Sequence, residues 1–194
     1  MKCFEVECKC GAVRLRVDVP RRGAGTRVVC HCKDCQTAAR ALGAQDLLGP
    51  GAGTDIWQTT PDKLCIVQGG EHLRVLRLSP KGLSRWHAGC CDTPMMNTLR
   101  KATLPFVGVV LGAPDVARDK ITGPVFAHAF TASAPPGTGG PLKDVNFART
   151  GLGVVTRMIG AYLSGKSGEN PVLGLMDAPV RVLSLEERKA STPA

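Results

Sequence analysis

Aromatic side chains are scarce in this sequence: they make up 4% of its 194 residues, with two tryptophans and one tyrosine. Hydrophobic residues nevertheless reach 43%, so a core of ordinary size must be built mainly from Val, Leu and Ala. No apolar run approaches the roughly 18 residues that indicate a membrane-spanning helix. Residues 1–5 also have no apolar signal core. We therefore expect a cytoplasmic protein that has no membrane partner.

The basic residues do not form the pattern of a nucleic-acid-binding surface, although the formal net charge is +9 at pH 7. They are scattered, and no row of aromatic side chains accompanies them for base stacking. Arg14 and Arg16 alternate along one face of an expected strand. Four more basic residues are expected at outward positions of a later hairpin: Arg74, Arg77, Lys81 and Arg85. We interpret this charge as solvated surface and do not expect nucleic acid as a partner.

Short alternating segments between turns predict a mainly β fold. The 23 glycines and 14 prolines indicate many turns, and residues 13–19 alternate apolar and polar side chains as a half-buried strand does. Residues 33–42 favour a short helix that Gly43 ends. Further strands are expected at 4–9, 27–32, 55–59, 63–67, 73–78, 83–89, 106–111 and 125–130.

The last third of the sequence has a different character. Residues 132–143 have the composition of a Pro/Gly-rich linker, which separates a domain at 1–131 from a helical extension at 144–194. Residues 146–164 repeat apolar side chains with a helical period: Leu152, Val155, Ile159, Tyr162 and Leu163. We expect this helix to pack on the β core; a partner surface or a homo-oligomer contact is the alternative. Residues 186–194 are expected to be a frayed tail.

Most of the nine cysteines lie in three tight clusters. The first is Cys8 and Cys10 before Gly11, the second is Cys30, Cys32 and Cys35, and the third is the pair Cys90 and Cys91. In a reducing compartment, clustered cysteines are more often metal ligands than disulfides. Such spacing brings several sulfurs to one point, as thiolate coordination of Zn²⁺ requires. Cys3 and Cys65, outside the clusters, are expected as small buried core residues.

The order of these clusters resembles that in the glutathione-dependent formaldehyde-activating enzymes and centromere-protein-V-like proteins. The match covers about residues 3–112 and includes the segment Arg85-Trp-His-Ala-Gly-Cys-Cys-Asp-Thr-Pro94. The resemblance implies a mainly β, Mss4-like zinc fold with two Zn²⁺ ions per chain. It assigns Cys8 and Cys10 to a structural zinc, together with a late cysteine pair. It assigns Cys30, Cys32 and Cys35 to a second zinc that has only three protein ligands.

The third cluster departs from the family pattern, in which two residues separate the late cysteines. Aligned on Arg85, the first family position falls on Ala88 and the second on Cys91, so Cys90 is an additional neighbour. We predict that Cys8, Cys10, Cys90 and Cys91 bind the structural zinc. Alternatively, Cys91 alone ligates from this cluster, and His87 or water completes the site.

Two classes of function stay open on these grounds. A three-cysteine zinc has one position for a substrate, so an enzyme of the carbon–sulfur lyase type could act there on a small-molecule thiol or a thiol adduct, such as a glutathione conjugate. His31 is the nearest candidate for a catalytic base or hydrogen-bond donor in the sequence, or it points away as a strand residue. The second class is a non-catalytic, zinc-stabilised module that binds a partner through the helix at 146–164. A fourth protein ligand at the second zinc, such as Cys3, would favour this class.

Overall fold

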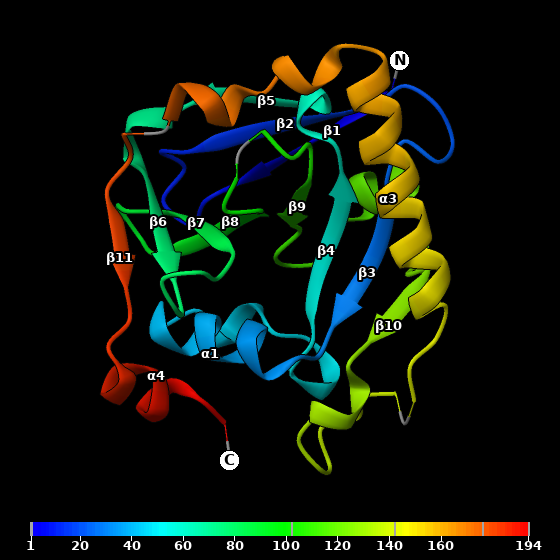
Figure 1. Cartoon of the computed structure of the whole chain (residues 1–194). Coiled ribbons are helices and arrows are strands. Elements are labelled where there is room, and N and C mark those ends of the chain that lie inside the picture. The colour runs from blue at the N-terminus through cyan, green and yellow to red at the C-terminus, as the bar shows by residue number, and fades with distance from the viewer. Residues whose placement is uncertain (1, 102, 142, 176, 194) are drawn as a thin grey trace.

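The computed structural model describes residues 2–101, 103–141, 143–175 and 177–193 and has two β-sheets with helices around them (Figure 1). A three-stranded antiparallel sheet has the order β1-β2-β5, with β1 at Lys2–Glu7, β2 at Arg14–Val19 and β5 at Leu64–Gln68. An eight-stranded sheet has the order β10-β3-β4-β9-β8-β7-β6-β11. Its strands are β3 Thr26–Cys30, β4 Thr54–Thr59, β6 Leu73–Arg77, β7 Ser84–Ala88, β8 Thr93–Thr98, β9 Val107–Val110, β10 Ala127–Ala129 and β11 Val180–Val182.

Four α-helices and several 3₁₀ turns complete the chain. The α-helices are α1 Lys33–Ala41, α2 Val116–Thr122, α3 Phe147–Leu163 and α4 Leu185–Ser191. The 3₁₀ segments are Gln45–Leu47, Pro50–Ala52, Pro61–Lys63, Gly70–His72, Thr131–Ser133, Lys166–Gly168 and Pro171–Leu175. Within the described ranges, no helix is long and apolar enough to cross a bilayer.

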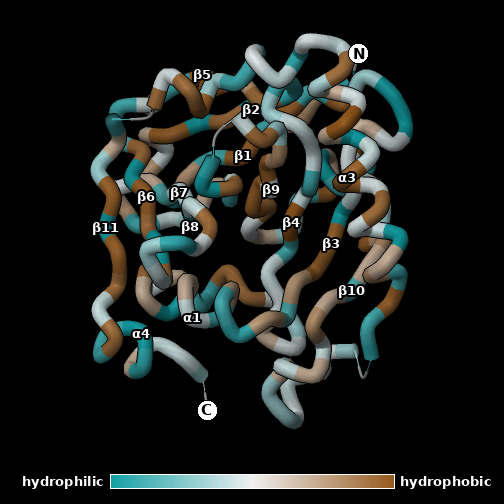
Figure 2. Tube along the Cα trace, viewed as in Figure 1, coloured by the Kyte–Doolittle hydropathy of each residue, from teal (hydrophilic) through white to brown (hydrophobic). Residues whose placement is uncertain are grey.

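The mainly β prediction is confirmed, and the alternating pattern explains it. On β2, Leu15 and Val17 are buried and pair with Val6 and Phe4 of β1 in the core, while Arg14 and Arg16 alternate with them on the other face. Both tryptophans are core residues, with Trp57 packed edge-on against Phe4. Hydrophobic segments run through the interior strands, such as β9 (Figure 2).

The large sheet is strongly curved, and α1 lies across one end of it (Figure 1). Its two edge pairings are parallel, β10 with β3 and β11 with β6, whereas the inner pairings are antiparallel. The chain leaves β3 directly into α1, so the second cysteine cluster sits at the junction of sheet and helix. This junction is the part of the fold that positions the candidate site.

The C-terminal segment differs from the sequence prediction. The expected frayed tail instead contains α4, which begins with a capping box between Ser184 and Glu187 and packs beside α1. Strand β11 adds an edge to the main sheet through residues that the sequence pattern did not single out. The proposed domain boundaries at 131 and 143 stay a prediction, and Leu142 lies outside the described residues.

Helix α3 forms where expected, but its apolar stripe does not face the core. Its five members, Leu152, Val155, Ile159, Tyr162 and Leu163, are between 51% and 79% exposed. The residues that bury against the sheet are instead small, Thr150 and Ala161. The helix contacts β3, β4 and β10, but these contacts do not bury the apolar stripe, which stays largely exposed.

Cys3 is exposed, which corrects the prediction of a buried core residue. Because Phe4 and Val6 point into the core from β1, the strand alternation turns Cys3 to the opposite face. Cys65 on β5 is partly buried.

Candidate metal centres

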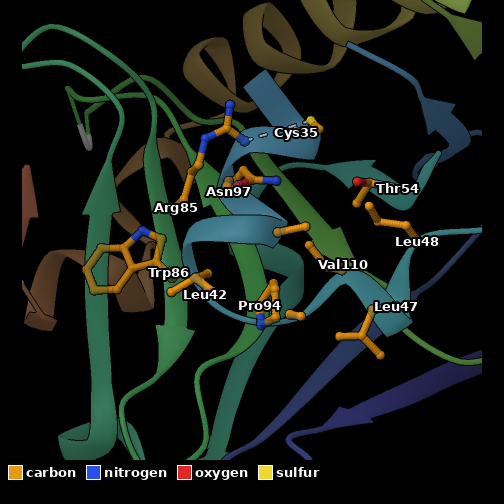
Figure 3. Close-up of a pocket in the computed structure, with 13 residues that line it drawn as sticks. Cys35, Leu42, Leu47, Leu48, Thr54, Arg85, Trp86, Pro94, Asn97 and Val110 are labelled. Atoms are coloured by element: carbon orange, nitrogen blue, oxygen red, sulfur yellow. Dashed lines mark hydrogen bonds between the residues drawn. The ribbon is translucent and has the colours of Figure 1, made fainter. Parts of the chain in front are cut away.

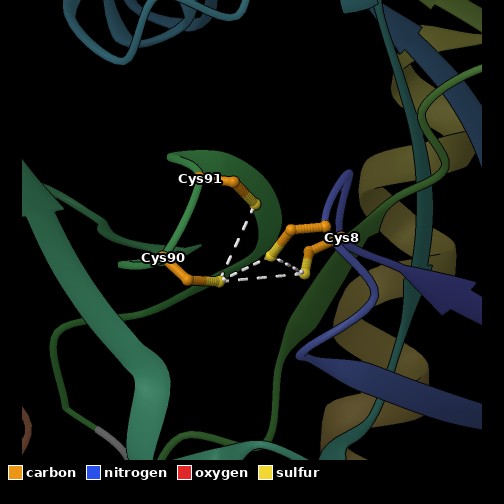
Figure 4. A group of neighbouring side chains, drawn as sticks. Cys8, Cys90 and Cys91 are labelled. Atoms are coloured by element: carbon orange, nitrogen blue, oxygen red, sulfur yellow. Dashed lines mark hydrogen bonds between the residues drawn. The ribbon is translucent and has the colours of Figure 1, made fainter.

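The first and third cysteine clusters meet at two tight turns that are about 80 residues apart in the sequence. Cys8 and Cys10 lie in the turn between β1 and β2, where Gly11 has φ 77° and donates its N–H to the Cys8 carbonyl oxygen. Cys90 and Cys91 lie in the turn between β7 and β8, next to Asp92, whose φ is 52°. The two left-handed residues allow both turns to direct their sulfurs toward one point (Figure 4).

The four sulfurs have the separations of a tetrahedral thiolate site. Cys10 Sγ lies 3.1 Å from Cys90 Sγ and 3.5 Å from Cys8 Sγ. Cys90 Sγ lies 4.0 Å from Cys8 Sγ and 3.8 Å from Cys91 Sγ. A zinc ion with Zn–S bonds of about 2.3 Å separates its sulfurs by about 3.8 Å. The four residues therefore fit a closed Cys₄ site, and every separation is far longer than a disulfide bond.

Polar groups next to this cluster change the pKa values of its thiols. The Thr93 hydroxyl lies 3.1 Å from Cys91 Sγ. Burial opposes ionisation of Cys91, but hydrogen bonds from Thr93 and from the Cys10 backbone outweigh it and lower the pKa of this thiol to about 6. The neighbouring Cys10 sulfur raises the pKa of Cys90 to about 12. His87 Nδ1 lies 3.1 Å from Asp92 Oδ1, so it serves the turn and is not part of the sulfur group.

The second cluster is built by the end of β3 and the first turn of α1. Cys30 is the last residue of β3, Cys32 is the N-cap of α1, and Cys35 lies in its first turn. The Cys35 backbone N–H donates to Cys32 Sγ at 3.3 Å, and Cys35 Sγ lies 3.7 Å from Cys30 Sγ. All three sulfurs lie within 4.8 Å of one another. These separations fit three ligands of one tetrahedral ion.

Arg85 is the charged partner of this cluster. Its side chain is buried, and its Nη1 donates to Cys35 Sγ at 3.8 Å (Figure 3). Hydrogen bonds from Cys30 and Cys32, together with the Arg85 guanidinium, hold the pKa of the Cys35 thiol well below its usual range. Hydrogen bonds to Cys32 and Cys35 raise the pKa of Cys30. For Cys32, the hydrogen bond with Cys30 lowers the pKa, but the contact with Cys35 and burial outweigh it and the pKa is raised, so only one of the three thiols ionises readily by itself. A bound cation would allow all three to ionise.

The outward position predicted for Arg85 was wrong. Every residue of β7 is buried, so both faces of the large sheet are covered at this strand. A signal was present in the sequence, since Ser84, Trp86 and Ala88 give a strand with few charges around this single arginine.

All three cysteines line a cavity of about 460 Å³, together with residues of β4, β7 and β8. Among the residues that the structure describes, no fourth Cys, His, Asp or Glu joins their sulfur group. Cys3 is not a fourth ligand of this group, because it lies on β1 of the small sheet, whereas Cys30 lies on β3 of the large sheet. A metal ion held by the three sulfurs would therefore border the cavity with a position for an external ligand.

His31 lies between two of these cysteines but points away from them. It is fully buried, its Nδ1 lies 2.9 Å from the Gly51 carbonyl oxygen, and its Nε2 lies 3.2 Å from His128 Nδ1. Both ring nitrogens are thus engaged, and the two imidazoles stack. His31 therefore contacts the 49–53 loop through Gly51, and its ring is not part of the group of three sulfurs.

This chain matches a protein family and, at low sequence identity, is similar to a solved structure. Residues 1–181 match the family described as "Family of unknown function (DUF6151)". A crystal structure of a Rhodobacter sphaeroides protein, a structural-genomics target, is similar at 20% sequence identity with a TM-score of 0.42. This similarity covers 65% of the present chain and 99% of the other. No curated protein matches the sequence.

Proposed function

The chain belongs to the DUF6151 family, and we propose that it is a zinc protein with one structural and one reactive site. Cys8, Cys10, Cys90 and Cys91 hold the structural ion in this proposal, and Cys30, Cys32 and Cys35 hold the other. The observation that carries it is the contrast between the two groups. Four sulfurs close the first, whereas three sulfurs at a cavity wall leave the second accessible to a small molecule. All-sulfur ligand sets favour Zn²⁺ over hard cations such as Mg²⁺.

The reaction that suits the second site is carbon–sulfur bond cleavage or formation on a thiol adduct. A zinc ion there would supply a Lewis acid that stabilises a thiolate leaving group. In such a cleavage the electron pair of the C–S bond stays on sulfur, and the adduct's hydroxyl proton is released as its carbon becomes a carbonyl. The family resemblance of the cysteine pattern makes the S-hydroxymethyl adduct of glutathione the first substrate to test.

Residues of the chain itself have two roles in this proposal. Arg85 places positive charge beside Cys35 and favours its thiolate form. The cavity wall limits access of water to the reacting sulfur, because most of its lining is apolar. We assign no general base, since His31 is engaged elsewhere.

The test is an exchange measurement by NMR on a mixture of formaldehyde and glutathione, with protein whose zinc content has been measured. We expect the protein to speed exchange between free and adduct formaldehyde, and Cys32→Ser to abolish the effect together with one zinc. Cys65→Ser, a change outside both clusters, is the matched control and should keep both. Protein that carries two zinc ions and leaves the exchange rate unchanged would contradict an activity on this adduct.

The other class of function, a zinc-stabilised interaction module, rests on a separate observation, the exposed apolar stripe of α3. The exposed stripe of α3 carries no charged side chain, and its five apolar residues expose on the order of 600 Å² in total, the upper end for a patch on a monomer. Two such patches together approach the roughly 1,200 Å² of a small stable interface. We therefore propose a second copy of this chain as the occupant of the stripe. Such a homo-oligomer is compatible with either class of function.

A further inference from the structure

The cavity beside the three cysteines gathers most of the phenylalanines of the chain. Phe106, Phe130 and Phe147 line it, and the whole sequence contains only five phenylalanines. They come from separate segments: the approach to β9, the turn after β10, and the first residue of α3. Because only 4% of the residues are aromatic, the gathering of three phenylalanines at one cavity indicates a ligand with an apolar surface.

Two of these rings form the rim of the cavity. Phe130 and Phe147 pack edge to face with centroids 5.1 Å apart, yet they remain 47% and 46% exposed. Phe130 has φ 59°, a left-handed conformation that is unfavourable for a bulky residue. The next residue anchors this turn, since the Thr131 N–H and hydroxyl both donate to Asp144 Oδ1. The fold thus holds an aromatic ring at the rim at a cost in backbone strain.

Charged groups are few around the same cavity, and most have partners. Three charged residues line it: Lys33, Asp34 and Arg85. Arg85 donates to Cys35, and Asp34 accepts from Arg188 at 3.3 Å. Within the described residues, Lys33 is therefore the one cation at this cavity whose side chain makes neither a hydrogen bond nor an ion pair. A peptide thiol such as glutathione carries two carboxylates and an ammonium group at neutral pH, and burying such charges without partners is costly.

We propose that this cavity selects a thiol whose organic part is apolar or aromatic, in preference to a charged peptide thiol. The proposal rests on the function proposed above for the three-cysteine site, and it names the substrate class of that site. The thiol sulfur lies at Cys30, Cys32 and Cys35, and the organic part packs against Phe106, Phe130 and Phe147. The volume of about 460 Å³ is within the usual range for small-molecule sites.

The test uses full-length protein in which cobalt(II) replaces zinc, because thiol binding to cobalt alters its visible spectrum. Phenylmethanethiol and glutathione are titrated as probes. We expect phenylmethanethiol to bind at least ten times more tightly. Phe147→Ala should weaken its binding about tenfold, and Phe130→Gly should do the same without backbone strain. Phe126→Ala is the matched control, since Phe126 is 43% exposed but does not line this cavity.

Equal or tighter binding of glutathione would overturn the proposal, as would an unchanged affinity in both Phe147→Ala and Phe130→Gly. A parallel titration with phenylmethanol, followed by NMR of the phenylalanine rings, separates the cavity from the metal. If phenylmethanol binds and Phe147→Ala weakens it while no thiol alters the cobalt spectrum, the apolar preference stands and the reactive site fails. If thiols alter the spectrum and phenylmethanol does not bind, the reactive site stands and the apolar preference fails.

Discussion

Arg85 and Cys35 lie in contact, with Nη1 3.8 Å from Sγ, although 50 residues separate them in the sequence. Arg85 comes from β7, an interior strand of the curved sheet, and Cys35 comes from the first turn of the helix that crosses its end. The contact therefore links the β core to the helix that carries Cys35 and is capped by Cys32. It also puts a buried positive charge beside the sulfur that ionises most readily.

Replacing Arg85 should make Cys35 harder to ionise. In Arg85→Gln the guanidinium charge is lost while a hydrogen-bond donor remains, so the pKa of Cys35 should rise toward its ordinary value. The measurement is the rate of iodoacetamide alkylation against pH in metal-free protein, with peptide mapping to isolate Cys35. The alkylation profile should move to higher pH. Arg77→Gln, a change on the neighbouring strand β6, should leave the profile in place, and an unmoved profile in Arg85→Gln would refute the electrostatic role.

Metal content should separate the two clusters. Wild-type protein purified without oxygen should carry two zinc ions per chain by elemental mass spectrometry. Cys90→Ser should carry one and lose thermal stability, because all four sulfurs of its group have the spacing of ligands. Cys3→Ser, an exposed cysteine outside both groups, should keep two. Two zinc ions in Cys90→Ser would mean that Cys91 ligates without its neighbour and that another ligand completes the site.

The apolar stripe of α3 should control the oligomeric state. Leu152→Glu places a charge at the N-terminal end of a stripe that has none, and two copies could not bury this charge together without cost. Light scattering coupled to size exclusion should show a dimer for the wild-type protein and at least tenfold weaker association for this variant. Leu185→Glu on α4 is the control, because Leu185 is 86% exposed and lies outside the stripe. A wild-type protein that is monomeric at high micromolar concentration would remove the second copy as the occupant.

The sequence predicts the local elements well and their surroundings less well. Strand β2 and helix α1 follow from alternation and from a helix-ending glycine, since both signals are local. Alternation alone does not predict the burial of Arg85. The low charge of its strand is a weak signal, and the burial itself depends on α1, which comes from a distant part of the chain. The stripe of α3 misled for the same reason, since periodicity marks an apolar face but not what covers it.

The candidate sites also differ in how far local sequence signals predict them. The two cysteine groups follow from spacing and order, because the turn at Cys8–Gly11 and the start of α1 are local structures. The cavity does not, since Phe106, Phe130 and Phe147 carry no common sequence pattern and meet only through the sheet topology. Phe130 occupies a left-handed position that its residue type does not suggest.

The rim of the cavity should lose stability in acid through Asp144. Hydrogen bonds from the Thr131 N–H and hydroxyl lower the pKa of this carboxyl in the folded protein. A group with a depressed folded pKa stabilises the fold fully above its unfolded pKa of about 3.9, and this contribution disappears as the pH falls through the folded value. Asp144→Asn should therefore lower Tm by about 2–4 °C at pH 7, for the loss of about 1 kcal/mol. The gap between the two proteins should close below pH 4. Glu169→Gln, which removes another exposed carboxylate, should show no such gap, and a constant gap from pH 7 to pH 3 would show that the charge of Asp144 does not hold the turn that carries Phe130.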